Sequence, residues 1–76
     1  MKISVKTPLM HDKIIALFDN NTISDLNFHF IEKKGIELLF ELEGQDKDSD
    51  EVIAVVKKTI KDTDFGKGIY FSVVVV

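Results

Sequence analysis

The sequence contains no cysteine and no arginine, and each absence removes classes of function. Without cysteine there is no disulfide framework, no thiolate metal site and no cysteine nucleophile. Small secreted domains usually depend on disulfides, so we expect a cytoplasmic protein. The planar guanidinium of arginine is the usual group for bidentate recognition of phosphate and carboxylate. Its absence argues against nucleic-acid binding and against most sites of phosphoryl transfer.

Long apolar segments are also missing. The first eight residues, MKISVKTP, lack the apolar region of a signal peptide. The longest run of one apolar residue type is VVVV at 73–76, which is far too short to cross a bilayer. We therefore expect no membrane association.

What is present suffices for one small globular domain spanning residues 1–76. The 76 residues are 45% hydrophobic, which is enough for a core and too much for a disordered chain. The formal net charge is −3. A chain of this length buries a smaller share of its surface than larger domains do, so we expect a modest stability.

Four segments are expected to be β-strands: 2–6, 26–32 and 36–43 alternate polar and apolar residues, and 69–76, with one polar residue, is apolar on both sides. The alternation predicts which side chains of the first three segments face a core. These residues are Ile3, Val5, Leu26, Phe28, Phe30, Ile36, Leu38, Phe40 and Leu42.

Two segments have the spacing of amphipathic helices. For the first, Thr7 is the expected N-cap and Pro8 the first helical residue. For the second, Asp48 is the expected N-cap, with Glu51 in the position of a capping box. The apolar stripes that define the two helices consist of Met10, Ile14, Leu17 and Phe18, and of Val52, Val55, Val56 and Ile60.

The resulting order of strand, helix, strand, strand, helix, strand resembles the ferredoxin-like βαββαβ fold over the whole chain. The resemblance rests on the order and length of the elements. It implies an α+β two-layer sandwich whose antiparallel sheet has the order 4-1-3-2, with both helices on one face. The alternative is a two-layer α+β domain with the same elements in another strand order.

In this arrangement the fourth strand lies at an edge of the sheet. Edge strands normally carry charge, proline or a bulge that prevents pairing with another chain, and residues 69–76 contain none of these. We therefore expect a non-catalytic interaction module that forms a homodimer through strand 69–76 or the open face of the sheet. The expected interface residues are Tyr70, Val74, Val76 and Leu39. The alternative is that the last valines are loose in solvent.

Basic residues gather at one end of the predicted fold, close to the start of the first helix. Free N–H groups at a helix start favour anions. A candidate anion site therefore consists of Lys6, Thr7, His11, Lys33, Lys34 and Lys67. Such a site would make the chain a regulatory domain that binds a small anion or an amino acid. That function is similar to the ACT type, although KTPLMHD lacks the glycine expected in that loop. Alternatively, these lysines are simply solvated.

The acidic loop 46–51, DKDSDE, superficially suggests calcium. An EF-hand loop counted from Asp46 needs glycine at the sixth position and glutamate at the twelfth. Glu51 and Lys57 occupy those positions, so the motif fails. The acids are better explained as a cap with favourable charges for the second helix, and whether the loop binds a cation stays open.

No catalytic constellation or cofactor motif is recognisable. His11 and His29 fall on different layers of the predicted fold, so a shared site is not expected. RNA-recognition modules of this topology stack bases on aromatic residues of the first and third strands, where this chain has Ser4, Lys6 and Leu39. The cysteine pair of the soft-metal carriers and the arginine of the acylphosphatases are absent. We expect no enzyme activity, no cofactor and no metal site.

Overall fold

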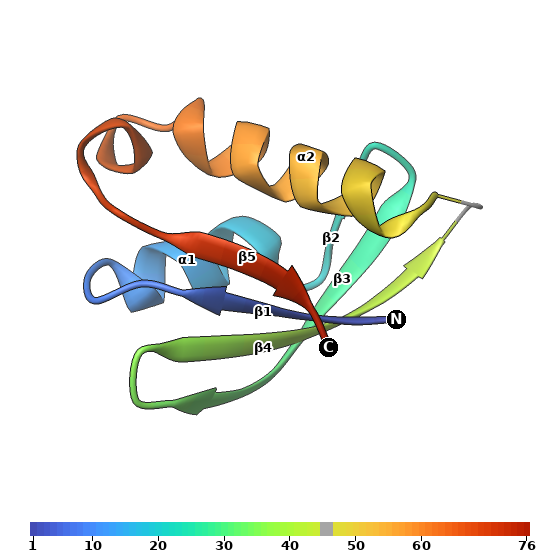
Figure 1. Ribbon diagram of the computed structural model, residues 1–76, viewed down its shortest axis with the longest axis horizontal. Coiled ribbons are helices and arrows are strands. Elements are labelled where there is room, and N and C mark those ends of the chain that lie inside the picture. The colour runs from blue at the N-terminus through green and yellow to red at the C-terminus, as the bar shows by residue number, and fades with distance from the viewer. Residues whose placement is uncertain (45–46) are drawn as a thin grey trace.

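The computed structural model, which describes residues 1–44 and 47–76, has two layers (Figure 1). One layer is a five-stranded antiparallel sheet with the order β2-β3-β4-β1-β5, and the other consists of two α-helices. The elements in chain order are β1 Lys2–Lys6, α1 His11–Phe18, β2 Asn21–Ile23, β3 Leu26–Lys34, β4 Glu37–Gly44, α2 Ser49–Lys61, the 3-10 helix η1 Phe65–Gly68 and β5 Ser72–Val75.

The α+β class agrees with the prediction, but the sheet has five strands and so does not match the order 4-1-3-2 as it stands. Within the sheet, the four predicted strands lie side by side in the order β5, β1, β4, β3. The unpredicted β2 extends the sheet beyond β3. The structure is compatible with a ferredoxin-like fold that carries this added strand. β2 pairs with β3 across Ser24 and Asp25, which have φ values of 52° and 66°. Two positive φ values are typical of a tight hairpin turn.

The core lies between the sheet and the helices. Phe18 of α1 packs against the sheet, with its ring 5.0 Å from that of Phe28 and 5.7 Å from that of Phe40. The side chains that the alternation predicted to face inward on β1 are fully buried, as are most of those on β3 and β4. The buried residues are Ile3, Val5, Ile14, Phe18, Leu26, Phe28, Leu38, Phe40, Leu42, Val52, Val56, Ile60 and Val73.

The start of α1 differs from the prediction. The helix begins at His11, so Thr7 is not its N-cap and Pro8 is not its first residue. Thr7 is instead fully buried, and its hydroxyl donates to the carbonyl of Leu9 at 2.9 Å. Met10 occupies the N-cap position with φ 65° and is exposed, so it does not belong to the buried stripe. A hydrogen bond from a side chain to a carbonyl two residues ahead competes with helix formation, so residues 7–9 remain outside α1.

A β-bulge changes the alternation in the second half of β3. Phe30 pairs with Phe40 and Glu32 pairs with Leu39, which leaves Ile31 as the extra residue. Beyond the bulge, every residue of β3 points to the opposite side from that expected by simple alternation.

Ile36 was predicted to face the core, and this is wrong. It lies in the turn between β3 and β4 and is 53% exposed. The turn has two residues, of which Gly35 has φ 61°. Glycine with a positive φ at the first position is typical of a type II′ hairpin, so Ile36 takes the second turn position and lies outside the strand.

The second helix begins as predicted, since the Asp48 carboxylate accepts the N–H of Glu51 at 2.8 Å. After the helix, residues 65–68 form η1, so the last strand is shorter than the predicted 69–76 and covers Ser72–Val75. None of the helices in the described ranges 1–44 and 47–76 has the length and hydrophobicity needed to cross a membrane.

Candidate functional site: the open sheet face and the edge strand

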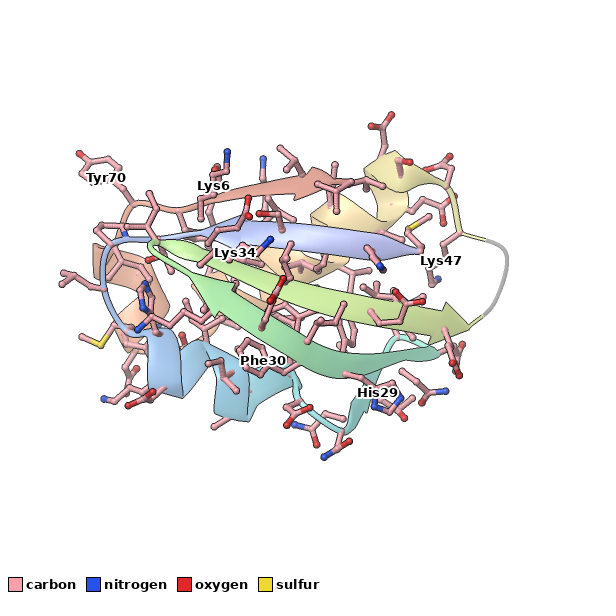
Figure 2. The ribbon with its side chains drawn as sticks, turned by 90° about the horizontal axis from the view of Figure 1, so that it is seen from below. Lys6, His29, Phe30, Lys34, Lys47 and Tyr70 are labelled. Atoms are coloured by element: carbon pink, nitrogen blue, oxygen red, sulfur yellow. The ribbon has the colours of Figure 1, made fainter. Side chains whose placement is uncertain are left out.

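The sheet face that carries no helix is organised in cross-strand rows of side chains (Figure 2). In one row Lys2 lies opposite Glu41, and in another Lys6 lies opposite Glu37. The second row continues to Lys34 on β3. Opposite charges on directly paired positions stabilise a sheet by about 0.2–1 kcal/mol per pair. The charged side chains of these rows are suited to contact with water.

Between the charged rows lies an apolar row. Ser4 at its centre is paired with Val74 on β5 and with Leu39 on β4. Ser4 is fully buried by its neighbours, and its hydroxyl has no hydrogen-bond partner. Val74 is 41% exposed, and Val76 further along the same strand is 64% exposed. We call Val74, Val76 and Leu39 the apolar strip.

Of the four residues predicted to form an interface, the fold therefore gathers three into this strip. Tyr70 is 91% exposed and precedes β5, so it stands at the far end of the strand from Val76 (Figure 2). It belongs to the same edge of the sheet but not to the same cluster of side chains.

β5 is an edge strand, hydrogen-bonded to β1 on one side only. The N–H of Val76 donates to the carbonyl of Lys2 at 3.0 Å. This bond shows which residues of β5 are hydrogen-bonded to β1. Because hydrogen-bonded residues alternate along an antiparallel pair, Ser72 and Val74 also direct their backbone groups toward β1. Val73 and Val75 direct theirs outward. The chain thus presents two outward-facing backbone positions on a strand without a charged residue.

The predicted anion site is divided by the fold. His11 and Lys33 line one hollow of about 380 Å³ at the start of α1, together with Lys13. Lys33 reaches this side of the sheet because the bulge at Ile31 places it opposite the buried Leu38. His11 also contacts the chain itself, since its Nε2 lies 2.5 Å from the carbonyl oxygen of Thr7.

The other members of the predicted site lie elsewhere. Lys6 and Lys34 are on the open sheet face, where Lys34 forms an ion pair with Glu32 at 3.2 Å. Lys67 lies in η1, and the Thr7 hydroxyl donates its hydrogen bond to the carbonyl of Leu9. Only two of the six predicted residues therefore share one cavity.

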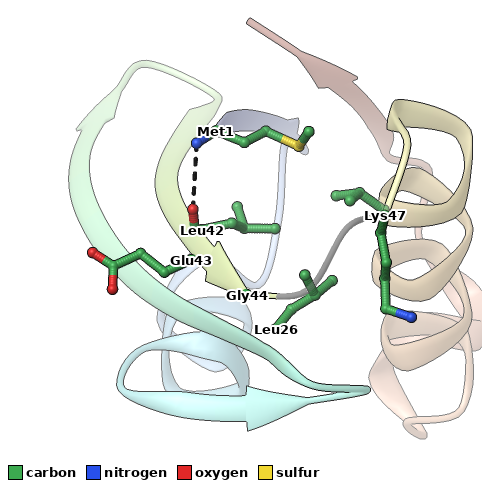
Figure 3. A pocket seen from close by; sticks show the side chains of 7 residues that line it. Met1, Leu26, Leu42, Glu43, Gly44 and Lys47 are labelled. Carbon is green, nitrogen blue, oxygen red and sulfur yellow. Dashed lines mark hydrogen bonds between the residues drawn. The ribbon is translucent and has the colours of Figure 1, made fainter.

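A second hollow, of about 320 Å³, was not predicted from the sequence (Figure 3). Its apolar wall includes Leu26 and Leu42, and its charged lining includes Glu43 and Lys47. The amino group of Met1 donates to the carbonyl of Leu42 at 3.3 Å on one side of it. No pattern in the sequence could have indicated it, because the N-terminal residue, β3, β4 and α2 meet only in the folded chain.

A third hollow, of about 230 Å³, lies between α2 and the segment that leads into β5. It is lined by Lys57, Lys61, Ile69, Tyr70 and Phe71. The two lysines are four residues apart, which places them on one side of the helix. The sequence shows this spacing, but it does not show that residues 69–71 pack beside the two lysines.

The remaining polar candidates have structural partners or lie apart. Asp48 caps α2, and the Asp46 of the acidic loop falls outside the described residues. His29 lies on the open face with Nδ1 3.2 Å from the Asn20 side-chain oxygen, whereas His11 lies in the helical layer. Within residues 1–44 and 47–76, His, Asp and Glu side chains form no group of three that could hold a metal ion.

Comparisons with protein-family models, with curated proteins and with solved structures gave no match to this chain.

Proposed function

We propose that the protein is a small non-catalytic interaction module of the cytoplasm, with a ferredoxin-like core, that self-associates through β5 and the adjoining open sheet face. The observation that carries the proposal is the edge of β5, which has no charge, proline or bulge and lies beside the exposed Val74 and Val76. Edges of this kind are templates for pairing with another strand.

The apolar strip would supply the free energy of self-association. Complete burial of an exposed valine contributes about 1.5–3 kcal/mol, and Val74 and Val76 retain 41% and 64% of their accessible surface. Covering both on two copies would therefore contribute several kcal/mol, on the order of what offsets the loss of translational freedom on association. Backbone hydrogen bonds from the edge would add to this. The lysine and glutamate rows on the same face supply no comparable gain, because contacts between exposed charges contribute only about 0–1 kcal/mol.

The test is the mass in solution. We expect sedimentation or light scattering to give twice the chain mass, and V74K/V76K to give the mass of one chain. The matched control is I31K/I36K, which adds the same two charges at positions that are 44% and 53% exposed and lie away from β5. A wild-type monomer up to millimolar concentration, or a dimer that V74K/V76K leaves intact, would contradict the proposal.

A second candidate is the binding of a small anion or amino acid at the hollow beside α1, as in a regulatory domain of the ACT type. It is favoured by the joint placement of His11, Lys13 and Lys33 around one cavity at a helix start. Met10 at the N-cap position supplies no side-chain acceptor to the free N–H groups there. Lysine can bind an anion as a point charge, so such a site does not require arginine.

This candidate is tested by titration with inorganic phosphate and with an acidic amino acid, followed by amide chemical shifts. Shifts should cluster at residues 8–13 and at Lys33, which line the hollow, and K33Q should remove them. K34Q is the control, since that lysine lies on the open face with Glu32. Unchanged spectra at millimolar ligand would remove this function from consideration.

A further inference from the structure

One flank of α2 faces the free edge of β5. Lys57 and Lys61 line the hollow beside Ile69, Tyr70 and Phe71, which lead directly into β5. At 3.6 residues per turn, Asp50 lies 7 and 11 residues before these lysines and therefore on the same flank of the helix. All three charged side chains are exposed.

The charges along this flank are separated by sign. Asp50 lies in the first turn of α2, and the two lysines lie in its second half. β4 and β5 both pair antiparallel with β1 and hence run in the same direction, so the intervening α2 runs opposite to β5 (Figure 1). The acidic end of the flank thus lies near Val75, and the basic end lies near the start of the strand.

We propose that the partner of β5 is a second copy of this chain, paired antiparallel along the two β5 edges about a two-fold axis normal to the sheet. This rests on the proposed self-association and specifies its geometry. Such an axis keeps both helical layers on the same face and brings the two α2 helices together in opposite directions. Asp50 of each copy then faces Lys57 and Lys61 of the other.

The charge pattern selects this arrangement over its alternatives. An axis along the strands would pair the edges in parallel and place the two helical layers on opposite faces, so the charged flanks would not meet. Face-to-face stacking of the open sheet faces would leave the α2 flank outside the contact. Only in the antiparallel edge pairing does the acidic end of the α2 flank in one copy face the basic end of the same flank in the other copy.

The outward backbone groups fix the register. Val73 and Val75 carry the free N–H and C=O groups, so Val73 pairs with the partner's Val75, and the reverse. Val74 then lies opposite Val74 of the partner subunit at the axis, in a pair without mutual hydrogen bonds. Side chains approach most closely at such pairs. Two five-stranded sheets become one continuous sheet, and the two apolar strips become adjacent on its open face.

The charge contact is tested by mixing two variants, each of which should dimerise poorly alone. In D50K a lysine faces lysines, and in K57E/K61E glutamates face Asp50, so each homodimer should dissociate about tenfold more readily than wild type. A mixture of the two should form a heterodimer of wild-type affinity, because both of its contacts are attractive. Raised salt should reduce these differences.

E51K and K58E are the control pair, because each reverses one exposed charge about a quarter-turn further round α2, away from the flank that faces β5. Each should dimerise as the wild type does. Circular dichroism should show that every variant retains the fold, because all of the altered side chains are exposed.

The register is tested by V74C, since the chain has no cysteine of its own. Oxidation should join two V74C chains, because directly opposed residues of such a pair have the Cα separation that a disulfide requires. S72C is the control, because in this register Ser72 lies opposite Val76 of the partner subunit and far from Ser72 of the partner subunit. A dimer in which V74C does not cross-link and the charge variants have no effect would overturn this geometry and leave self-association standing. A monomeric wild type would overturn both.

Discussion

The Asp19 carboxylate accepts the backbone N–H of Phe30 at 2.9 Å. Asp19 follows α1, and the next residue, Asn20, donates its own N–H to the carbonyl of Phe28 at 2.8 Å. The carboxylate therefore continues along β3 the row of bonds that the short β2 begins. One edge of the sheet is closed by an acidic side chain in this way, whereas the edge at β5 is not.

We expect D19A to lower the free energy of unfolding by about 1.5–3 kcal/mol, because it leaves a half-buried backbone donor without its charged acceptor. Urea denaturation measures the change. D64A is the control, since Asp64 is exposed and makes no capping bond to η1. Equal stability of the two variants would show that the contact to Phe30 contributes nothing.

Ser4 and Thr7 are both fully buried, but only Thr7 has a hydrogen-bond partner for its hydroxyl. We expect S4A to leave stability unchanged or to raise it by up to about 1 kcal/mol, because an unsatisfied buried hydroxyl costs free energy. T7V keeps the shape of the side chain and should lower stability by about 1 kcal/mol, because it removes the bond to Leu9. Thermal and urea unfolding of the two variants should move in different directions, and a loss of stability in S4A comparable to that in T7V would contradict this account.

Gly66 and Gly68 lie two residues apart in η1 and differ in their surroundings. A Cβ atom at Gly66 would overlap the carbonyl oxygen of Ile60, whereas a Cβ at Gly68 would meet nothing within 4 Å. We expect G66A to be strongly destabilising, because the helix end would have to move. G68A should be neutral or stabilising by about 0.4–1 kcal/mol, because it restricts the unfolded chain. The comparison of their melting temperatures is informative, since G66A and G68A add the same methyl group.

The cap of α2 gives a fourth prediction. We expect D48A to lower the free energy of unfolding by about 1 kcal/mol, because the N–H of Glu51 loses its acceptor. D48N keeps a side-chain oxygen at the same position and should retain most of the stability. If D48A and D48N were equally destabilised, the effect would come from the lost charge near the helix start and not from the hydrogen bond.

The division of the predicted lysine site shows how a single bulge limits inference from alternation. Strict alternation places Ile31 and Lys33 on the same face, but the bulge leaves Ile31 unpaired and sets Lys33 opposite Leu38. The residues on either side of Ile31 are Phe30 and Glu32, so no adjacent glycine or proline marks the irregularity. The bulge is decided by how β3 and β4 pair over their full length, which is a property of the two strands together.

The unpredicted β2 has a similar origin. Asn21, Thr22 and Ile23 are too few to show a period, and the turn of Ser24 and Asp25 lacks the Asn-Gly or Asp-Gly pair that usually indicates a hairpin. These residues form a strand because β3 offers them a free edge beside Leu26 and Phe28.

By itself the sequence determined the class of fold, the inward rows of β1 and β4, the cap at Asp48 and the uncharged strand that holds Val74. These features depend on residues close together in the chain, where a period of two or a side chain three positions away fixes the geometry. Only the tertiary structure decided which face Lys33 occupies, that Thr7 is buried instead of capping a helix, and that the Lys57 flank of α2 lies beside the edge of β5. Those features depend on contacts between segments far apart in sequence, and such contacts exist only once the sheet and helices have packed together.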